Sequence, residues 1–351
     1  MDINGSGMKL VAIGGGTGLS TLLRGLKHYV INNCGIETRW KSWIEQLTAL
    51  VTVTDDGGSS GQLRREMHIL PPGDIRNCMV ALAEDEALMT QLFKYRFEGD
   101  GQLQGHSFGN LFLTAMTAVV GDFLQAIQLA SEVLAIRGQI YPATVDDVRL
   151  AAELTDGRTL HGETNITAAR SGIKQLWLEP ARVQALPEAI KAIREADVIT
   201  IGPGSLFTSI LPNLLVPGIV DAIAASPAQK IFICNVMTQP GETDGFRPLD
   251  HLETVQQYAA KLHFDAMLVN CAYISSQQHN HYAAKGLFPV LDPFADHNSS
   301  RLINTGVGRL TAIHYADLID EESPVRHSSS KLALKITELI QAKLLRLAKP
   351  A

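Results

Sequence analysis

Residues 10–18 limit the possible folds of this chain more than any other segment. Residues 10–13 form a continuous apolar run, which is typical of a buried parallel strand, and residues 19–26 show helical spacing. Between them, glycines let the backbone approach phosphate oxygens, and the first N–H groups of the helix face the negative charge. The segment predicts the entry to a nucleotide-binding α/β unit. Its candidate phosphate-binding residues are Gly14, Gly15, Gly16, Thr17 and Gly18.

This loop departs from both standard phosphate-binding signatures. Leu19 occupies the position of the last glycine in the pattern G-x-G-x-x-G read from Gly14. No Lys-Ser or Lys-Thr pair follows, so the loop is not a Walker A loop either. A tight strand-to-helix turn without a ligand therefore remains an alternative.

A second polar loop follows the next predicted strand, residues 47–54, which is rich in Val and Thr. Two acids open the loop, and in dinucleotide-binding folds an acid at this position binds a ribose hydroxyl. Adjacent carboxylates could instead hold a Mg²⁺ ion that bridges to a phosphate. An Asp-Gly turn with solvated acids is the alternative. The candidates are Asp55, Asp56, Gly57, Gly58, Ser59 and Ser60, with Asp55 and Asp56 as metal ligands.

Three later apolar runs, residues 197–201, 230–234 and 266–269, also read as strands that end in polar loops. In an open parallel sheet the carboxyl ends of the strands lie along one edge, where ligands bind at the switch in strand order. Five such loops predict an extended site for a nucleotide sugar or a dinucleotide, in which an aromatic ring could stack on the base. These three loops add Gly202, Pro203, Gly204, Ser205, Asn235, Thr238 and the aromatic Tyr273.

The order of elements predicts an α/β, Rossmann-like fold with a mostly parallel sheet and helices on both faces. A small mixed or antiparallel excursion is expected within residues 139–178. One nucleotide-binding domain with insertions is expected over residues 8–320, with a basic C-terminal helix in 321–351 and a disordered tail or expression remnant in 1–7. A long helix is expected over 75–97, and a buried helix over the apolar residues 111–120.

Three polar residues outside these loops have both structural and functional interpretations. Asp74 is expected to cap the helix 75–97, and Arg76 in its first turn could reach a ligand. His106 could be a general acid or base, or a histidine packed between helices. The chain shows no G-x-S-x-G elbow and no convincing metal-ligand spacing. The sequence therefore supports ligand binding more firmly than catalysis.

Composition excludes several classes of function. The formal net charge of −6 gives no reason to expect broad nucleic-acid binding. Four scattered cysteines without a C-x-x-C pattern suit a reduced, cytosolic protein. No apolar segment is long enough to span a bilayer, and residues 1–7 lack the regions of a secretion signal.

Several motifs together resemble the YvcK-type gluconeogenesis factors, and the resemblance extends from Met8 to about Ala316. The motifs are Gly14–Leu19, Thr54–Gly61, Pro72–Asn77, Gly105–Asn110, Gly202–Ser209 and Met237–Thr243. This family is similar in fold to the CofD-type 2-phospho-L-lactate transferases of deazaflavin cofactor biosynthesis. Those enzymes use a divalent metal that acidic residues hold near the phosphates.

The resemblance also carries expectations about function. It implies a cytoplasmic protein, a homodimer, and a role in cell shape and wall-precursor balance during growth on gluconeogenic carbon. Family members bind uridine-diphosphate sugars, and Thr17, Tyr273 and Arg309 correspond to their ligand-contacting positions.

Two functions follow from these observations. The first is a regulatory protein that binds a nucleotide sugar with little or no turnover. The alternative is a Mg²⁺-dependent phosphotransferase of the 2-phospho-L-lactate transferase type, in which Asp55 and Asp56 hold the metal. The sequence leaves open whether the protein is an enzyme.

Overall fold

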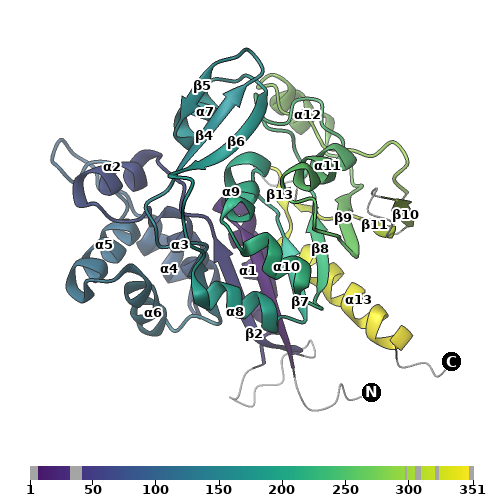
Figure 1. The fold of residues 1–351 in the computed structure, drawn as a ribbon, viewed down its shortest axis with the longest axis horizontal. Helices are drawn as coiled ribbons and strands as arrows, with labels where there is room; N and C mark the ends of the chain where they lie inside the picture. The colour runs from purple at the N-terminus through teal and green to yellow at the C-terminus, as the bar shows by residue number, and fades with distance from the viewer. Residues whose placement is uncertain (1–6, 32–41, 297–298, 305–309, 321–323, 348–351) are drawn as a thin grey trace.

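The computed structural model of the chain describes residues 7–31, 42–296, 299–304, 310–320 and 324–347. An eight-stranded sheet forms its centre, in the spatial order β10-β11-β9-β8-β7-β1-β2-β3 (Figure 1). Neighbouring strands run parallel except for β10 and β11. The strands are β1 (Met8–Gly14), β2 (Ile44–Val51), β3 (Gln139–Pro142), β7 (Val198–Ile201), β8 (Gln229–Ile233), β9 (Ala266–Asn270), β10 (Ser300–Asn304) and β11 (Leu310–Ala316).

The strand order reverses between β1 and β7. From β1 the sheet extends through β2 to β3, and on the other side of β1 it extends through β7, β8, β9 and β11. Val11 of β1 lies opposite Ile199 of β7 in parallel register. Ligands of open α/β sheets bind in the crevice at such a switch point, outside the carboxyl ends of the strands. The ends of β1 and β7 therefore define where a ligand is expected.

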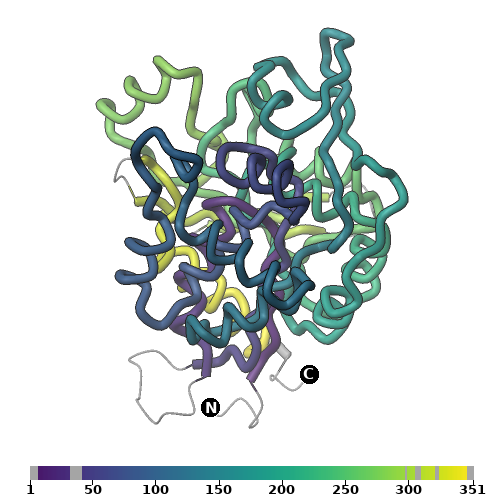
Figure 2. The backbone as a smooth tube through the Cα atoms, turned by 90° about the vertical axis from the view of Figure 1, so that its left-hand side faces the viewer, coloured from purple at the N-terminus to yellow at the C-terminus, as the bar shows by residue number. Residues whose placement is uncertain are grey.

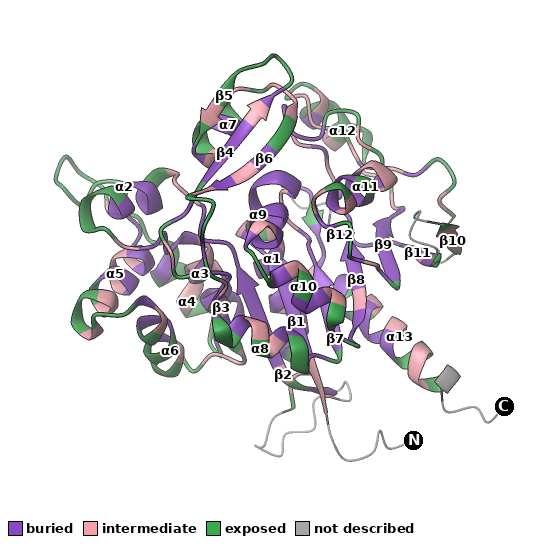
Figure 3. Ribbon diagram, viewed as in Figure 1, coloured by how far each residue is buried: buried purple, intermediate pink, exposed green. Residues whose placement is uncertain are grey.

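Helices cover both faces of this sheet, as the sequence predicts. Val11 and Ile13 of β1 belong to one hydrophobic core, whereas Leu10 and Ala12 belong to the other, because successive side chains of a strand point to opposite faces. The central strands β1, β2, β7, β8 and β9 are largely buried between the two layers, whereas the edge strand β10 is not (Figure 3). The first core includes α8 (Pro187–Glu195), α9 (Leu211–Leu215), α10 (Ile219–Ala225) and α11 (Pro248–Tyr258), and the second includes α1 (Gly16–Leu26), α3 (Gly73–Leu82), α6 (Phe123–Val133) and α13 (Ser329–Leu347).

A separate three-stranded antiparallel sheet confirms the predicted excursion. It consists of β4 (Arg149–Leu154), β5 (Thr159–His161) and β6 (Ile173–Glu179), and it stands above the main sheet in Figure 1. The helix α7 (Glu163–Ala168) connects β5 to β6. The strand β3, by contrast, joins the main sheet beside β2.

The remaining elements lie around the sheet. They are α2 (Gly58–Met67), α4 (Glu86–Lys94), α5 (Phe108–Val120), α12 (Ser276–Ala283), the short helices η1 (Lys27–Tyr29) and η2 (Leu206–Ile210), and the paired strands β12 (Ile319–Asp320) and β13 (Arg326–His327).

Three predictions about helices are wrong. The single helix over residues 75–97 is divided, because the backbone of Ala83 is extended and the Asp85 side chain caps α4 by accepting the Leu88 amide. Asp74 lies inside the first turn of α3 rather than at its cap. The apolar helix α5 is not buried all round, since it lies at the margin of the molecule and Val119 is 82% exposed. Apolar composition alone does not determine which helix lies outermost.

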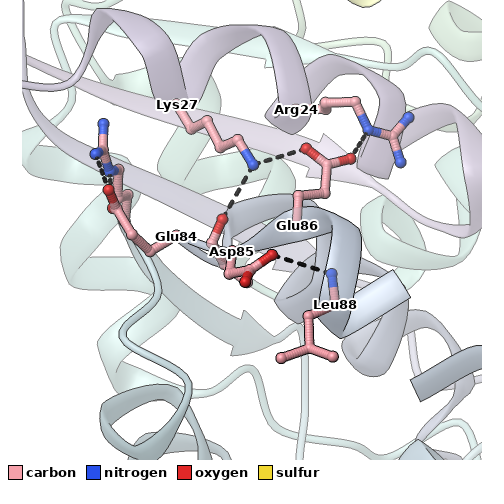
Figure 4. Close-up of polar contacts among 8 residues, drawn as sticks. Arg24, Lys27, Glu84, Asp85, Glu86 and Leu88 are labelled. Atoms are coloured by element: carbon pink, nitrogen blue, oxygen red, sulfur yellow. Dashed lines mark hydrogen bonds and ion pairs between the residues drawn. The ribbon is translucent and has the colours of Figure 1, made fainter. Parts of the chain in front are cut away.

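Polar contacts connect α1 to the α3–α4 junction (Figure 4). Lys27 is buried, and its Nζ donates to the Ala83 carbonyl at 3.0 Å and to Glu86 at 2.7 Å. Arg24 contacts the other oxygen of Glu86. Burial raises the pKa of Glu86, but the hydrogen bonds from Lys27 and Arg24 outweigh it and hold that pKa below its ordinary value. The pairing offsets the cost of burying the Lys27 charge.

The C-terminal helix α13 packs directly on α1, and it lies among the N-terminal elements in Figure 2. Gly25 permits this close approach, because a Cβ there would lie 2.0 Å from the Ser329 carbonyl oxygen. The backbone that leads into α13 is therefore held in a fixed position relative to α1.

No single helix in the described ranges has both the length and the apolarity needed to cross a membrane. Two sharply bent helix pairs reach that threshold only in combination, Phe108–Val120 with Phe123–Val133 and Leu206–Leu215 with Ile219–Ala225.

Candidate functional site

A cleft of about 510 Å³ opens at the switch in strand order; we call it the switch cleft. The ends of β1, β7 and β8 meet there with α7 and β13. Nine residues that the sequence predicts for the site line it: Gly15, Gly16, Thr17, Gly18, Pro203, Gly204, Ser205, Asn235 and Thr238. Residues far apart in the chain thus converge on one cavity, as the parallel-sheet argument requires.

The two glycine-rich loops of the switch cleft touch one another. A Cβ on Gly18 would lie 2.4 Å from the Pro203 carbonyl oxygen, so a side chain at this position would force the loops apart. The Gly204 amide donates to the Asn235 side chain at 3.1 Å, and Asn213 donates to the Gly14 carbonyl at 3.0 Å. These contacts fix the backbone of both loops around the cleft.

Hydroxyl groups and a buried carboxylate form the wall of the cleft next to β7. Ser205 Oγ donates to Glu242 at 2.6 Å, and Thr208 Oγ1 donates to Ser205 Oγ at 2.8 Å. Burial raises the pKa of Glu242, although hydrogen bonds from Ser205 and Thr167 oppose the shift. A chain of hydroxyls ending in a carboxylate orients its donors and acceptors for a polar ligand.

Further carboxylates gather beside the start of α1. Asp74 accepts a hydrogen bond from the Gly16 amide, yet burial and the neighbouring charge of Asp55 raise the pKa of Asp74 to about 6. Burial also raises the pKa of Glu163 well above its ordinary value, with further contributions from Asp55 and Asp74. Mutual repulsion of this kind favours protons or a cation among the carboxylates.

The predicted metal ligands Asp55 and Asp56 each accept hydrogen bonds through one carboxylate oxygen. Asp55 Oδ1 accepts the Gly57 amide at 2.9 Å, and Asp56 Oδ1 accepts both the amide and the hydroxyl of Thr164. Within the described ranges, no group of three or more His, Cys, Asp or Glu side chains is placed to hold a metal ion. Mg²⁺ commonly takes only one or two carboxylates together with water and substrate phosphates, so the donor chemistry suits it.

A second cleft, of about 520 Å³, lies beyond Asp56 on the side of α2. The predicted residues Asp56, Gly58 and Ser59 line this second cleft rather than the switch cleft. His106 is buried, and its Nδ1 lies 3.0 Å from the hydroxyl of Ser59. This contact favours the packed interpretation of His106.

Arg76 has a structural role between two helices and does not line the second cleft. Its guanidinium donates to Ser107 at 2.7 Å and to Asn110 at 2.9 Å, which fixes α3 to the start of α5. Arg76 does not line the switch cleft.

The other predicted residues lie outside both cavity walls or outside the described ranges. Tyr273 is 78% exposed in the loop after β9 and does not line the switch cleft. Neither cleft is lined by Gly14, Asp55, Gly57, Ser60 or Gly202. Arg309 falls in a segment outside the described residues.

Sequence reasoning missed several residues of the switch cleft, and five of them bear on its chemistry. Glu242 lies in a motif that the sequence singles out, and so offered a signal. The others have no local pattern that marks them, because they reach the cleft through long-range packing. The five are Glu163, Thr167, Glu242, Arg326 and His327.

Comparisons with known proteins agree with this architecture. The model of the family described as 2-phospho-L-lactate transferase CofD matches residues 10–305. The gluconeogenesis factor of Halalkalibacterium halodurans is 44% identical over 329 residues, which cover 94% of this chain and 95% of that protein. The gluconeogenesis factor of Bacillus subtilis is 43% identical over 333 residues, which cover 95% and 98%.

A solved structure shows the same fold. The crystal structure of a UPF0052-family protein from Bacillus halodurans has a TM-score of 0.82 at 42% identity, and the match covers 95% of this chain and 99% of that chain.

Proposed function

Because the chain belongs to the family described as 2-phospho-L-lactate transferase CofD, and within it to the gluconeogenesis factors, we propose that it binds a uridine-diphosphate sugar in the switch cleft. One observation carries the proposal: the loops that follow β1 and β7 touch at Gly18 and Pro203 and line one cavity at the switch point. Glycine-rich backbone at the start of a helix is a recurrent phosphate-binding arrangement.

The chain's own groups suit a diphosphate linked to a sugar. Thr17 is exposed in the first turn of α1 and lines the cleft. Ser205 and Thr208 add hydroxyls to the lining of the same cleft. Under the proposal the glycine loops bind the phosphates and these hydroxyls bind the sugar or ribose. Tyr273 and Arg309 contact the ligand, as the family resemblance implies.

The wider role follows from the same family membership. Under the proposal the protein acts in the cytoplasm as a homodimer and supports cell shape and wall-precursor balance on gluconeogenic carbon. Residues 8–320 would form the nucleotide-binding domain, and the basic helix within 321–351 would be an addition to it.

A Mg²⁺-dependent phosphotransferase is the second candidate, and the repelling carboxylates Asp55, Asp74 and Glu163 favour it. Asp55 and Asp56 would hold the ion, since the Oδ2 atoms of both lack a hydrogen bond within the described ranges. A bound Mg²⁺ would neutralise charge on a phosphoryl group. Asp56 meanwhile holds the start of α7, and thereby positions Glu163 on the cleft wall.

Calorimetric titration with UDP-N-acetylglucosamine tests the first proposal. We expect saturable heat with wild-type protein, and its absence at millimolar ligand would contradict the proposal. Phosphorus NMR of the same mixture with MgCl₂ tests the second. Turnover that disappears in the double variant Asp55→Ala, Asp56→Ala would support a phosphotransferase, and a spectrum that never changes would count against it.

A further inference from the structure

Arg326 is the lone Lys or Arg among the described residues that line the switch cleft. It belongs to β13, and its side chain is exposed. Two carboxylates, Glu163 and Glu242, line the same cavity, yet the Arg326 guanidinium forms no ion pair with either in the described structure. The cleft thus contains a cation whose hydrogen-bond donors are available to a ligand.

Three backbone contacts fix the position of the strand that carries Arg326. The Val325 amide donates to the hydroxyl of Tyr282 at 2.8 Å, and the Ser328 amide donates to the Leu318 carbonyl at 2.8 Å. Asp320 of β12 pairs with Arg326 itself. Because α13 follows at once and packs on α1, the guanidinium is presented from a position fixed relative to the glycine loop. A fixed backbone lowers the ordering cost when a ligand binds.

The neighbouring His327 anchors the strand and adds no competing positive charge. Its ring is buried, and it donates to the backbone carbonyl of Cys234 at the end of β8. Burial lowers the pKa of His327 to about 4, so the ring is neutral near pH 7. The Nε2 atom of this ring has no hydrogen-bond partner in the described structure, which leaves one buried acceptor at the cleft wall.

Charge is distributed unevenly around the cleft. Negative charge gathers beside the start of α1. There the charge of Asp55 adds to the effect of burial in raising the pKa values of Asp74 and Glu163. At the other side, Arg326 lies close enough to Lys94 to contribute to lowering its pKa, after the larger effects of burial and Arg24. A diphosphate in the cleft would meet the Arg326 guanidinium on this side, and its charge would offset the negative charge beside the start of α1.

We propose that Arg326 binds the diphosphate of the ligand in the switch cleft and sets the preference for diphosphate over an uncharged nucleoside. The inference rests on the proposed nucleotide-sugar function and assigns one residue within it. A guanidinium offers two parallel N–H donors to phosphate oxygens, which a lysine ammonium does not. Lysine at this position would therefore restore only part of the affinity.

Titration of four probes into wild-type, Arg326→Gln and Arg326→Lys protein tests the assignment. The probes are UDP-N-acetylglucosamine, UDP, uridine and inorganic pyrophosphate, and Arg158→Gln is the matched control. Arg158 lies in the β4–β5 turn, pairs with Asp156 and lines neither cleft. Loss of a charge-assisted hydrogen bond should weaken both UDP ligands by about ten- to a hundredfold in Arg326→Gln. Uridine affinity should stay unchanged, and Arg326→Lys should fall between.

The outcomes separate this inference from the function on which it rests. If wild-type protein binds UDP and Arg326→Gln binds it equally well, or if uridine weakens as much as UDP, the assignment is wrong and the function stands. If wild-type protein binds no uridine compound, the proposed function is wrong, and pyrophosphate then decides. If wild-type protein binds pyrophosphate and Arg326→Gln does not, Arg326 remains a phosphate ligand. If wild-type protein does not bind pyrophosphate, the assignment of Arg326 is wrong. Thermal unfolding of each variant verifies that it is folded.

Discussion

The carboxylate of Asp74 accepts a hydrogen bond from the backbone amide of Gly16, so a side chain from α3 reaches the first turn of α1. A Cβ on Gly15 would lie 2.7 Å from the same carboxylate, which shows how closely it approaches the loop. An anionic ligand must therefore share the positive end of α1 with a partly buried acid. The protonation state of Asp74 then influences both stability and binding.

We expect the free energy of unfolding to fall as the pH rises toward the pKa of Asp74 in the folded protein. Its folded pKa of about 6 lies above the ordinary 3.8, so the folded protein holds the proton more tightly than the unfolded chain between about pH 4 and 6. Stability should decline across that window by up to about 1.4 kcal/mol per pH unit. Asp74→Asn should remove this slope in urea unfolding, whereas the exposed control Asp100→Asn should keep it. A slope that survives in Asp74→Asn would contradict the assignment.

We expect Mg²⁺ to stabilise the protein through Asp55. Burial raises the pKa values of Asp74 and Glu163, the charge of Asp55 adds to both shifts, and a cation would relieve this added repulsion. Millimolar MgCl₂ should raise the melting temperature by about 2 °C or more, and Asp55→Asn should lose that shift. The control Asp100→Asn should retain it. An equal magnesium shift in Asp55→Asn would rule out this carboxylate as a ligand.

We expect Gly18→Ala to damage both the fold and ligand binding. The added methyl group would lie 2.4 Å from the Pro203 carbonyl oxygen, so the two loops must separate. Overpacking of this kind costs about 1–3 kcal/mol in unfolding free energy. Gly101→Ala is the matched control, because a Cβ there meets no atom within 4 Å. If both variants unfold and bind UDP-N-acetylglucosamine alike, the loops are not in the contact described.

We expect the Lys27–Glu86 contact to matter more than exposed ion pairs. Glu86→Met would leave the Lys27 ammonium buried with only the Ala83 carbonyl as partner, at a cost of about 3 kcal/mol. Replacing both residues with methionine should recover much of that loss. Asp221→Asn, which breaks the exposed pair with Lys261, should cost less than about 1 kcal/mol. Chemical denaturation measures all four proteins, and equal losses in the Glu86 and Asp221 variants would refute the ranking.

Local sequence pattern predicts much of the fold. The apolar run before Gly14 is β1, and the Rossmann-like parallel sheet with helices on both faces is confirmed. Strand ends are less accurate: β2 stops at Val51 rather than at Thr54. Beyond it, the Thr52 amide bonds to the Gly14 carbonyl, a contact with a distant loop that local propensity does not encode.

The site is predictable only where loops carry their own signal. Glycine loops after β1 and β7 stand out, because backbone that approaches a ligand needs residues without side chains. Glu163 does not stand out, since the start of α7 is held by Asp56, far away in the chain, which accepts the Thr164 amide. Arg326 is likewise placed by packing of β13 against β12 and α13 against α1. Long-range contacts of this kind leave no periodic trace in a single sequence.

A crystal structure of the wild-type protein with UDP-N-acetylglucosamine measures the central claim most directly. We predict diphosphate density in the switch cleft, with phosphate oxygens about 3 Å from backbone amides of both the Gly14–Gly18 and the Gly202–Ser205 loops. Ligand density confined to another surface, or an empty switch cleft at millimolar ligand, would contradict the account.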